Sequence, residues 1–164
     1  MKKVIAVLSV LALLLSGCAS GEGEEKTYSL SQTPFSVSFR EGETVVSGVM
    51  SYVSPQEMTL SLSSPKEADG LVFSLKNGEF LFGFDGVFCR VENIQSLFGN
   101  SKGFQTLFEA FSALGKSETK ISKRKSKFSY PLGEAVASFD ESGFLSAVRA
   151  GSYDFEFTKI TKSA

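Results

Sequence analysis

Apolar and polar residues alternate over much of the chain from Pro34 onward, and this period of two predicts half-buried β-strands. Pro55 and Pro65 bracket one such segment, as expected for residues that cannot donate to a strand ladder. The clearest alternating segments are 35–39, 58–62, 135–139 and 153–160. The whole pattern predicts about seven to nine strands in one antiparallel meander.

The dipeptide Asn77-Gly78 predicts a hairpin, because it favours a two-residue type I′ turn. The expected strand pairs are Lys76 with Glu79, Leu75 with Phe80, Phe73 with Phe82 and Leu71 with Phe84. The last three pairs then place only large apolar side chains on one face of the hairpin.

One segment, 101–114, has the period of a helix. We expect Asn100 or Ser101 to cap its start and Gly115 to end it. Its apolar residues recur at spacings of three and four: Phe104, Leu107, Phe108, Phe111 and Leu114. The patterns together predict an α+β domain, in which a curved antiparallel sheet packs its apolar face on one or two helices.

Residues 1–17 have the layout of a secretory signal peptide. Lys2 and Lys3 precede the short apolar run 4–15, which is too short to span a bilayer. The next residues resemble the lipobox of bacterial lipoproteins, Leu15-Ser16-Gly17-Cys18. That resemblance implies cleavage between Gly17 and Cys18 and a lipid anchor on Cys18, at the extracytoplasmic face of the cell membrane. An ordinary secretory signal with an incidental cysteine is the alternative.

The remainder divides into a tether, 18–33, and one folded domain, 34–164. The tether is small, polar and acidic, with Glu22, Glu24 and Glu25 close together, and we expect it to be flexible. Removal of the signal peptide takes away two lysines and no acidic residue, so the formal net charge moves from -1 to -3.

The order of parts in the folded domain resembles the LolA/LolB-like lipoproteins. The resemblance rests on the strand meander, the Asp-Gly turns, the helical insertion, the segment 139–145 and the terminal strand 153–157. The segment 64–71 is also similar to small uncharacterised lipoproteins of Gram-positive gut bacteria. The resemblance implies an unclosed antiparallel half-barrel wrapped around helices, with an apolar cavity that takes up acyl chains.

The chain contains no histidine, which excludes Ser-His-Asp and Cys-His catalysis and an imidazole zinc site. Asp154 and Glu156 lie about 7 Å apart on one strand face, but that face is also expected to be simply the wet side of the strand. We therefore predict no catalytic residue, no metal and no cofactor besides the lipid on Cys18. Cys89 lies in an alternating segment, and we interpret it as a small buried hydrophobe.

Sixteen phenylalanines and no tryptophan make the predicted inner faces strongly aromatic. If the sheet and the helix close on each other, these side chains form a dry core; if the sheet curves away, they line a pocket for an apolar ligand. The candidate cavity residues are Phe73, Phe80, Phe82, Phe84, Phe104, Leu107, Phe108 and Phe111.

A basic patch follows the predicted helix: Lys120, Lys123, Arg124, Lys125 and Lys127. Contact with anionic lipid headgroups is the functional interpretation, and a solvated loop is the alternative. Nucleic acid is not an expected partner, because the exported chain is acidic overall and the patch has no interleaved aromatic residues. The identity of any protein partner is left open.

Our leading hypothesis is a membrane-anchored lipoprotein that binds or carries a lipid or other apolar ligand without catalysis. The alternative is a cell-surface interaction module with a solid core and no small-molecule ligand.

The lipobox makes the first prediction. Cys18→Ala removes the only thiol placed for acylation, so the variant should lose both labelling by an alkynyl fatty acid and membrane fractionation. Cys89→Ala is the matched control and should keep both. Labelling that persists in Cys18→Ala, or a wild-type protein that stays unlabelled with residues 1–17 intact, would contradict the lipobox interpretation.

Overall fold

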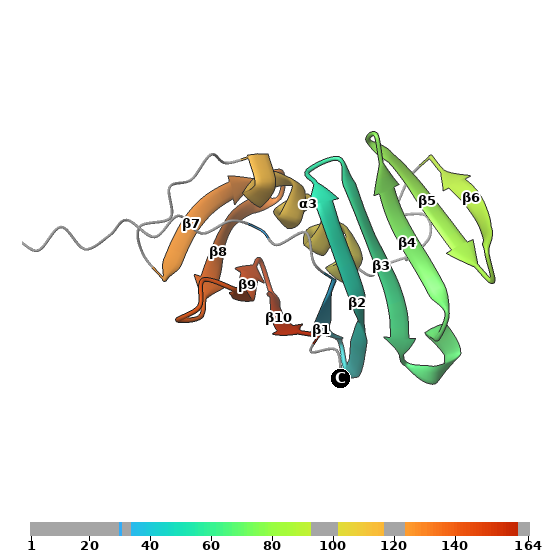
Figure 1. The fold of residues 1–164 in the computed structure, drawn as a ribbon, viewed down its shortest axis with the longest axis horizontal. Coiled ribbons are helices and arrows are strands. Elements are labelled where there is room, and N and C mark those ends of the chain that lie inside the picture. Colours follow the sequence, from blue (N-terminus) through green and yellow to red (C-terminus); the bar gives the residue numbers. More distant parts are fainter. Residues whose placement is uncertain (1–29, 31–33, 93–101, 117–123, 161–164) are drawn as a thin grey trace, which may run out of the picture.

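The computed structural model describes residues 30, 34–92, 102–116 and 124–160. Within these, 62% of residues lie in strands and 15% in helices. The strands form a single ten-stranded antiparallel sheet (Figure 1). The predicted signal peptide, cleavage site and lipidated Cys18 lie outside the described residues, as does all of the tether except Leu30.

The sheet consists of two antiparallel meanders that meet at its centre. Strands β1 to β6 run outward to one edge and β10 to β7 to the other, so the first and last strands pair in the middle. The elements are β1 (Phe35–Glu41), β2 (Thr44–Ser54), β3 (Glu57–Ser64), η1 (Lys66–Ala68), β4 (Leu71–Lys76), β5 (Glu79–Phe84), β6 (Val87–Val91), α3 (Gly103–Lys116), β7 (Lys125–Tyr130), β8 (Gly133–Phe139), β9 (Leu145–Ala150) and β10 (Tyr153–Lys159).

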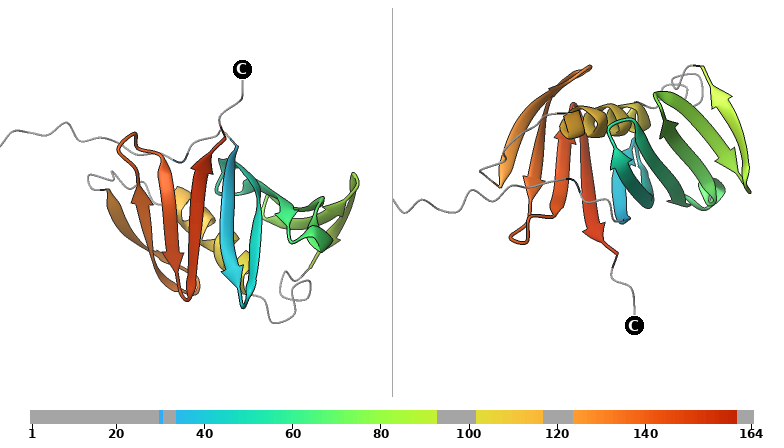
Figure 2. Two further views of the ribbon diagram at one scale, coloured as in Figure 1. Left: turned by 90° about the horizontal axis from the view of Figure 1, so that it is seen from below. Right: turned by 45° about the horizontal axis from the view of Figure 1, so that its top comes forward.

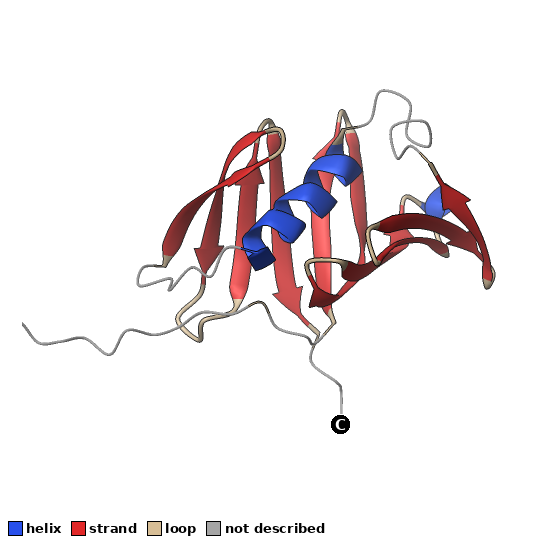
Figure 3. Cartoon of the chain, turned by 90° about the horizontal axis from the view of Figure 1, so that it is seen from above, coloured by secondary structure: helices blue, strands red, loops and turns tan. Residues whose placement is uncertain are grey.

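The connection between the meanders carries α3. Strand β6 is one edge of the sheet and β7 the other, so the chain between them must pass from edge to edge. Figures 2 and 3 show α3 crossing one face of the sheet on this path, with strands to either side of it.

The predicted α+β class, a LolA-like half-barrel packed on one or two helices, is wrong. The described residues form a mainly β structure, an open sheet of ten strands with a single α-helix and one short 3-10 turn. Ten strands spaced about 4.8 Å apart span roughly 43 Å, whereas a helix of 14 residues is only about 21 Å long. One helix therefore cannot form a second layer over the whole sheet.

The predicted hairpin is confirmed. All four expected pairs between β4 and β5 are present, from Lys76 with Glu79 to Leu71 with Phe84. Asn77 and Gly78 have φ of 53° and 81°, the left-handed backbone that a type I′ turn requires.

The helix begins two residues later than predicted, where Glu41 of β1 meets it. The backbone N–H of Gly103 donates to Glu41 Oε2 at 3.1 Å, and the Tyr153 hydroxyl of β10 donates to Glu41 Oε1 at 3.1 Å. A carboxylate here satisfies a free N–H of the first turn and faces the positive end of the helix dipole. The predicted caps, Asn100 and Ser101, lie outside the described residues.

The helix also does not end at Gly115, because it continues through Lys116. A Cβ on Gly115 would overlap the Tyr52 hydroxyl and would lie 3.0 Å from Pro55 Cγ. The glycine therefore allows the end of α3 to approach β2 and the β2–β3 turn closely.

The core lies between α3 and the inner face of the sheet, from β4 across the central strands to β7. Leu107 and Phe111 have no exposed surface, and the Phe111 ring lies 5.9 Å from Phe35 of β1 and 5.1 Å from Phe157 of β10. At the start of the helix, Phe104 packs edge-on against Phe39, with ring centroids 5.3 Å apart. The apolar stripe of the helix is thus closed against the middle of the sheet.

The junction at Glu41 makes the second prediction. Burial, then the Glu41 charge and hydrogen bond, raise the pKa of Tyr153 above its ordinary 10.0. At neutral pH, Tyr153→Phe should lower the free energy of unfolding by about 1–2 kcal/mol, because it removes a hydrogen bond to a carboxylate. Since the pKa of Tyr153 is raised, the folded state holds the Tyr153 proton more tightly than the unfolded state does. The resulting contribution to stability is fully present below pH 10 and is lost as the pH rises through the pKa of Tyr153 in the folded state.

The stability difference between wild type and Tyr153→Phe should therefore narrow above pH 10. Urea unfolding of both proteins at neutral and alkaline pH measures it. A difference that stays constant or widens would contradict this account of the junction.

Candidate ligand pocket

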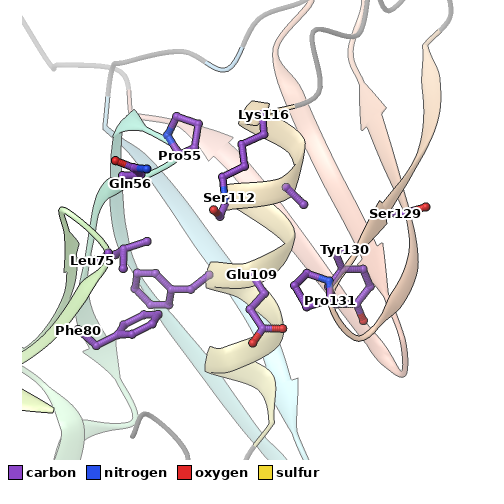
Figure 4. Close-up of a pocket in the computed structure, with 13 residues that line it drawn as sticks. Pro55, Gln56, Leu75, Phe80, Glu109, Ser112, Lys116, Ser129, Tyr130 and Pro131 are labelled. Atoms are coloured by element: carbon purple, nitrogen blue, oxygen red, sulfur yellow. The ribbon is translucent and has the colours of Figure 1, made fainter. Parts of the chain in front are cut away.

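The larger of two apolar hollows beside α3 lies over the C-terminal half of the helix and has a volume of about 540 Å³. Figure 4 shows its two walls: the β2–β3 turn with β4 and β5 on one side, and the β7–β8 turn on the other. The apolar lining comprises Pro55, Leu75, Phe80, Phe108, Ala113, Tyr130 and Pro131.

Local structure explains why these side chains converge. Leu75 and Phe80 are partners across the β4–β5 hairpin, so they share a face. Phe80 also packs edge-on against Phe108, with ring centroids 5.6 Å apart. Pro55 and Pro131 stand in the turns that follow β2 and β7, which brings two rigid apolar rings to opposite sides of the helix.

The floor of the pocket is the side of α3 that faces away from the core. Glu109, Ser112 and Lys116 follow one another at spacings of three and four, so they share a face. Figure 4 shows Glu109 and Lys116 toward opposite ends of this face. They are the only charged side chains among the residues that line the pocket.

Glu109 has an unusual environment. Its Oε1 accepts a hydrogen bond of 2.8 Å from Gln105 Nε2, one turn earlier. Its Oε2 is buried and accepts no hydrogen bond from any of the residues that the structure describes. Burial and, secondarily, the nearby Glu109 charge raise the pKa of Tyr130 above its ordinary 10.0.

A second hollow, of about 380 Å³, lies at the start of α3. It is walled by β2 to β5 and by the helix, and Glu41 stands at its rim. Its aromatic lining consists of Phe73, Phe82 and Phe104, and both Phe82 and Phe104 lie against Phe73, with ring centroids 5.3 Å and 5.1 Å apart.

The eight predicted cavity residues are not brought together in one cavity. Phe80 and Phe108 line the larger hollow, whereas Phe73, Phe82 and Phe104 line the smaller one. Leu107 and Phe111 are fully buried in the core, and Phe84 is 56% exposed. Both interpretations of the aromatic face thus apply to different parts of it: the centre is a dry core, and hollows remain at the two ends of the helix.

Sequence reasoning missed the polar floor of the larger hollow. Glu109 and Ser112 lie outside the predicted apolar stripe of the helix, and the face opposite such a stripe is normally solvated. The spacing of three and four predicts that one helix face carries Glu109, Ser112 and Lys116. Only the turns on either side of the helix, which this spacing does not predict, make that face the floor of a pocket.

The predicted basic patch is only partly described. Lys120 and Lys123 lie outside the described residues. Arg124 forms an ion pair with Glu141, with Nη2 2.9 Å from Oε1, and Lys125 and Lys127 are exposed on the edge strand β7. Headgroup binding by this patch stays a prediction.

Asp154 and Glu156 are both exposed on β10, away from the helix, and Asp154 Oδ1 forms an ion pair with Arg149 Nε at 2.6 Å. They border a hollow that is more polar than the other two and includes Ser38 and Arg40. Among the described residues, no cluster of three or more His, Cys, Asp or Glu side chains is placed to hold a metal ion. The prediction that Cys89 is buried is wrong: the thiol is exposed, and none of the described elements forms a layer over β6.

Comparison with protein-family models gives no match, and comparison with curated proteins gives none either. Within the described part of the chain, no helix combines the length and the apolar character needed to cross a membrane.

The pocket makes the third prediction. Glu109→Gln keeps the shape of the side chain but removes its charge, so the pKa of Tyr130 should fall toward its ordinary value while burial keeps it somewhat raised. Tyr52 is the internal control, because burial alone raises the pKa of its phenol. The carbon shifts of the tyrosine rings, followed by NMR through alkaline pH, measure both. If Glu109→Gln changed the pKa of Tyr52 and the pKa of Tyr130 equally, or changed neither, the result would contradict the proximity of the Glu109 charge to Tyr130.

Proposed function

We propose that this protein is a lipoprotein, anchored at the extracytoplasmic face of the membrane through acylated Cys18, that binds a lipid or other apolar ligand in the larger hollow over α3. It acts by binding, without catalysis. The observation that carries the proposal is the hollow itself: its 540 Å³ falls within the roughly 300–1,000 Å³ of small-molecule sites.

The composition of the lining supports an apolar occupant. Aromatic, proline and aliphatic side chains form both walls, and the hydrophobic effect gives roughly 25 cal/mol for each Å² of apolar surface that a ligand removes from water. Since most of these side chains are attached to the paired strands β4 and β5 or to the packed helix, little ordering is needed on binding.

A membrane anchor would place such a pocket beside a source of apolar molecules. The exposed Lys125 and Lys127 lie on β7, whose last residue, Tyr130, lines the pocket. Each Lys near an anionic membrane surface contributes about 1 kcal/mol of attraction. This arrangement favours an approach of the β7 side of the molecule to the headgroups.

The rival function, an interaction module that works through a sheet edge, is favoured by one observation. At the β6 edge, Phe84, Val87 and Phe88 are 56%, 69% and 51% exposed. Edge strands with exposed apolar side chains are templates for pairing with another chain, whereas lysines such as those of β7 discourage it. A protein that used only this edge would leave the hollow over α3 without a ligand.

The fourth prediction separates the two functions. A neutral alkyl alcohol that carries a photoreactive diazirine should label the purified full chain in phosphatidylcholine nanodiscs, at peptides that contain residues 75–80, 108–116 or 129–131. Ala113→Trp fills the pocket and should reduce this labelling about tenfold or more, a loss of at least about 1.4 kcal/mol in binding.

Val49→Trp is the matched control. Val49 is 39% exposed and alternates with the buried Gly48 and Met50, so its side chain lies on the face of β2 away from the helix. This variant should label like wild type. Labelling that is absent from wild type, or that Ala113→Trp leaves unchanged, would reject the pocket as a ligand site and favour the edge-strand module.

A further inference from the structure

The unsatisfied oxygen of Glu109 distinguishes the larger hollow from a purely apolar pocket. Buried polar atoms in proteins are almost always hydrogen-bonded, and a buried carboxylate oxygen without a donor is the costly exception. Within the described residues, Glu109 Oε2 is the only buried side-chain oxygen or nitrogen that has no hydrogen-bond partner. It belongs to a side chain that lines the pocket.

The geometry leaves this oxygen available to a ligand. Gln105 holds only Oε1, at 2.8 Å, so Oε2 keeps its full capacity to accept. The terminal torsion of a glutamate side chain is broad, so rotation of the carboxylate can turn Oε2 out of its covered position. A donor that arrives inside the pocket would therefore satisfy an acceptor that the protein itself leaves open.

The charge of Glu109 selects among donors. In surroundings lined by Phe80, Phe108 and Pro131, the attraction between a carboxylate and a protonated amine is far less screened than in water. Such charge-assisted hydrogen bonds are roughly twice as strong as those to a neutral hydroxyl. An anionic head would instead be repelled.

Lys116 limits the number of cationic groups that a ligand in this pocket can carry. It lies seven residues, or about 10 Å, further along the same helix face and is exposed. A ligand with a second cation at its other end would bring that cation close to the Lys116 ammonium group. The two charges thus favour a single amine, held near Glu109, on an otherwise apolar body.

We propose that the pocket over α3 binds an apolar molecule with one protonated amine, and that Glu109 recognises the amine. The inference rests on the proposed function and deepens it by naming the chemical class of the ligand. A protonated primary amine on an apolar chain is found in a free alkyl amine and, beside a phosphate, in the headgroup of some lipids, and the experiment separates these sources.

The test is competition against the photoreactive alcohol in the same nanodiscs. Octylamine, octanol and octanoate share one apolar chain, so they differ only at the head, and all are used below their micellar concentrations. Octylamine should suppress labelling at a concentration roughly tenfold lower than octanol, and octanoate should be the weakest. The lipid source is tested by comparing competition by lysophosphatidylethanolamine, which has an ammonium N–H, with competition by lysophosphatidylcholine, which has none.

Two carboxylate variants locate the effect. Glu109→Gln should abolish the advantage of octylamine over octanol while octanol competes as before. Glu156→Gln, an exposed carboxylate on the far face of β10, should keep the full advantage. In the wild-type protein, the carboxyl carbon resonance of Glu109 should shift on addition of octylamine and not of octanol, which tests the contact without any substitution.

The outcomes are separable. Equal competition by octylamine and octanol, or an advantage that survives Glu109→Gln, would overturn the amine inference and leave the apolar pocket standing. A wild-type chain that the photoreactive alcohol does not label would overturn the proposed function as well. If lysophosphatidylethanolamine competes no better than lysophosphatidylcholine while octylamine retains its advantage, the ligand is a free amine rather than a lipid headgroup.

Discussion

The packing of the apolar face of α3 on the paired strands β1 and β10 is the interaction on which the rest of the structure depends. We call this strand pair the seam. Along the chain, β1 and β10 are the first and last of the described strands, and among these strands their pairing is the only ladder that joins the two meanders. Phe111 packs on Phe35 from β1 and on Phe157 from β10, so one buried ring bridges both sides of the seam. Loss of this contact would therefore loosen the helix and the junction of the meanders together.

The candidate pocket follows from a mismatch in size between the two layers. The helix is about half as long as the sheet is wide, so it seals the centre and cannot cover the whole inner surface. Where the β2–β3 and β7–β8 turns lie close to the helix, that surface becomes a hollow. Beyond it, none of the described elements covers β6, and Val87 and Phe88 remain exposed. The same mismatch thus accounts for the hollow over α3 and for the exposed edge strand.

Local features of the fold could be predicted from the sequence, and long-range ones could not. The β4–β5 register follows from Asn77-Gly78 and a period of two, which involve neighbouring residues only. Pairing of β1 with β10 joins residues more than a hundred positions apart, and no local pattern indicates it. The error at Cys89 has a related cause: alternation predicts which face a side chain occupies, but burial also needs a second layer over that face. Glu109 likewise has the pattern of a solvated helix face, and only the distant turns at Pro55 and Pro131 enclose it.

Contacts at both ends of α3 determine where the pocket floor lies. Glu41 holds the first turn through the Gly103 N–H, while Gly115 lets the last turn lie against Tyr52 and Pro55. Glu109 stands between these two contacts, so its position relative to the walls is set by the sheet and not by its own hydrogen bonds. The contacts at both ends fix the helix backbone at Glu109, and among the described residues no donor reaches Oε2, so this open acceptor follows from where the fold places the helix.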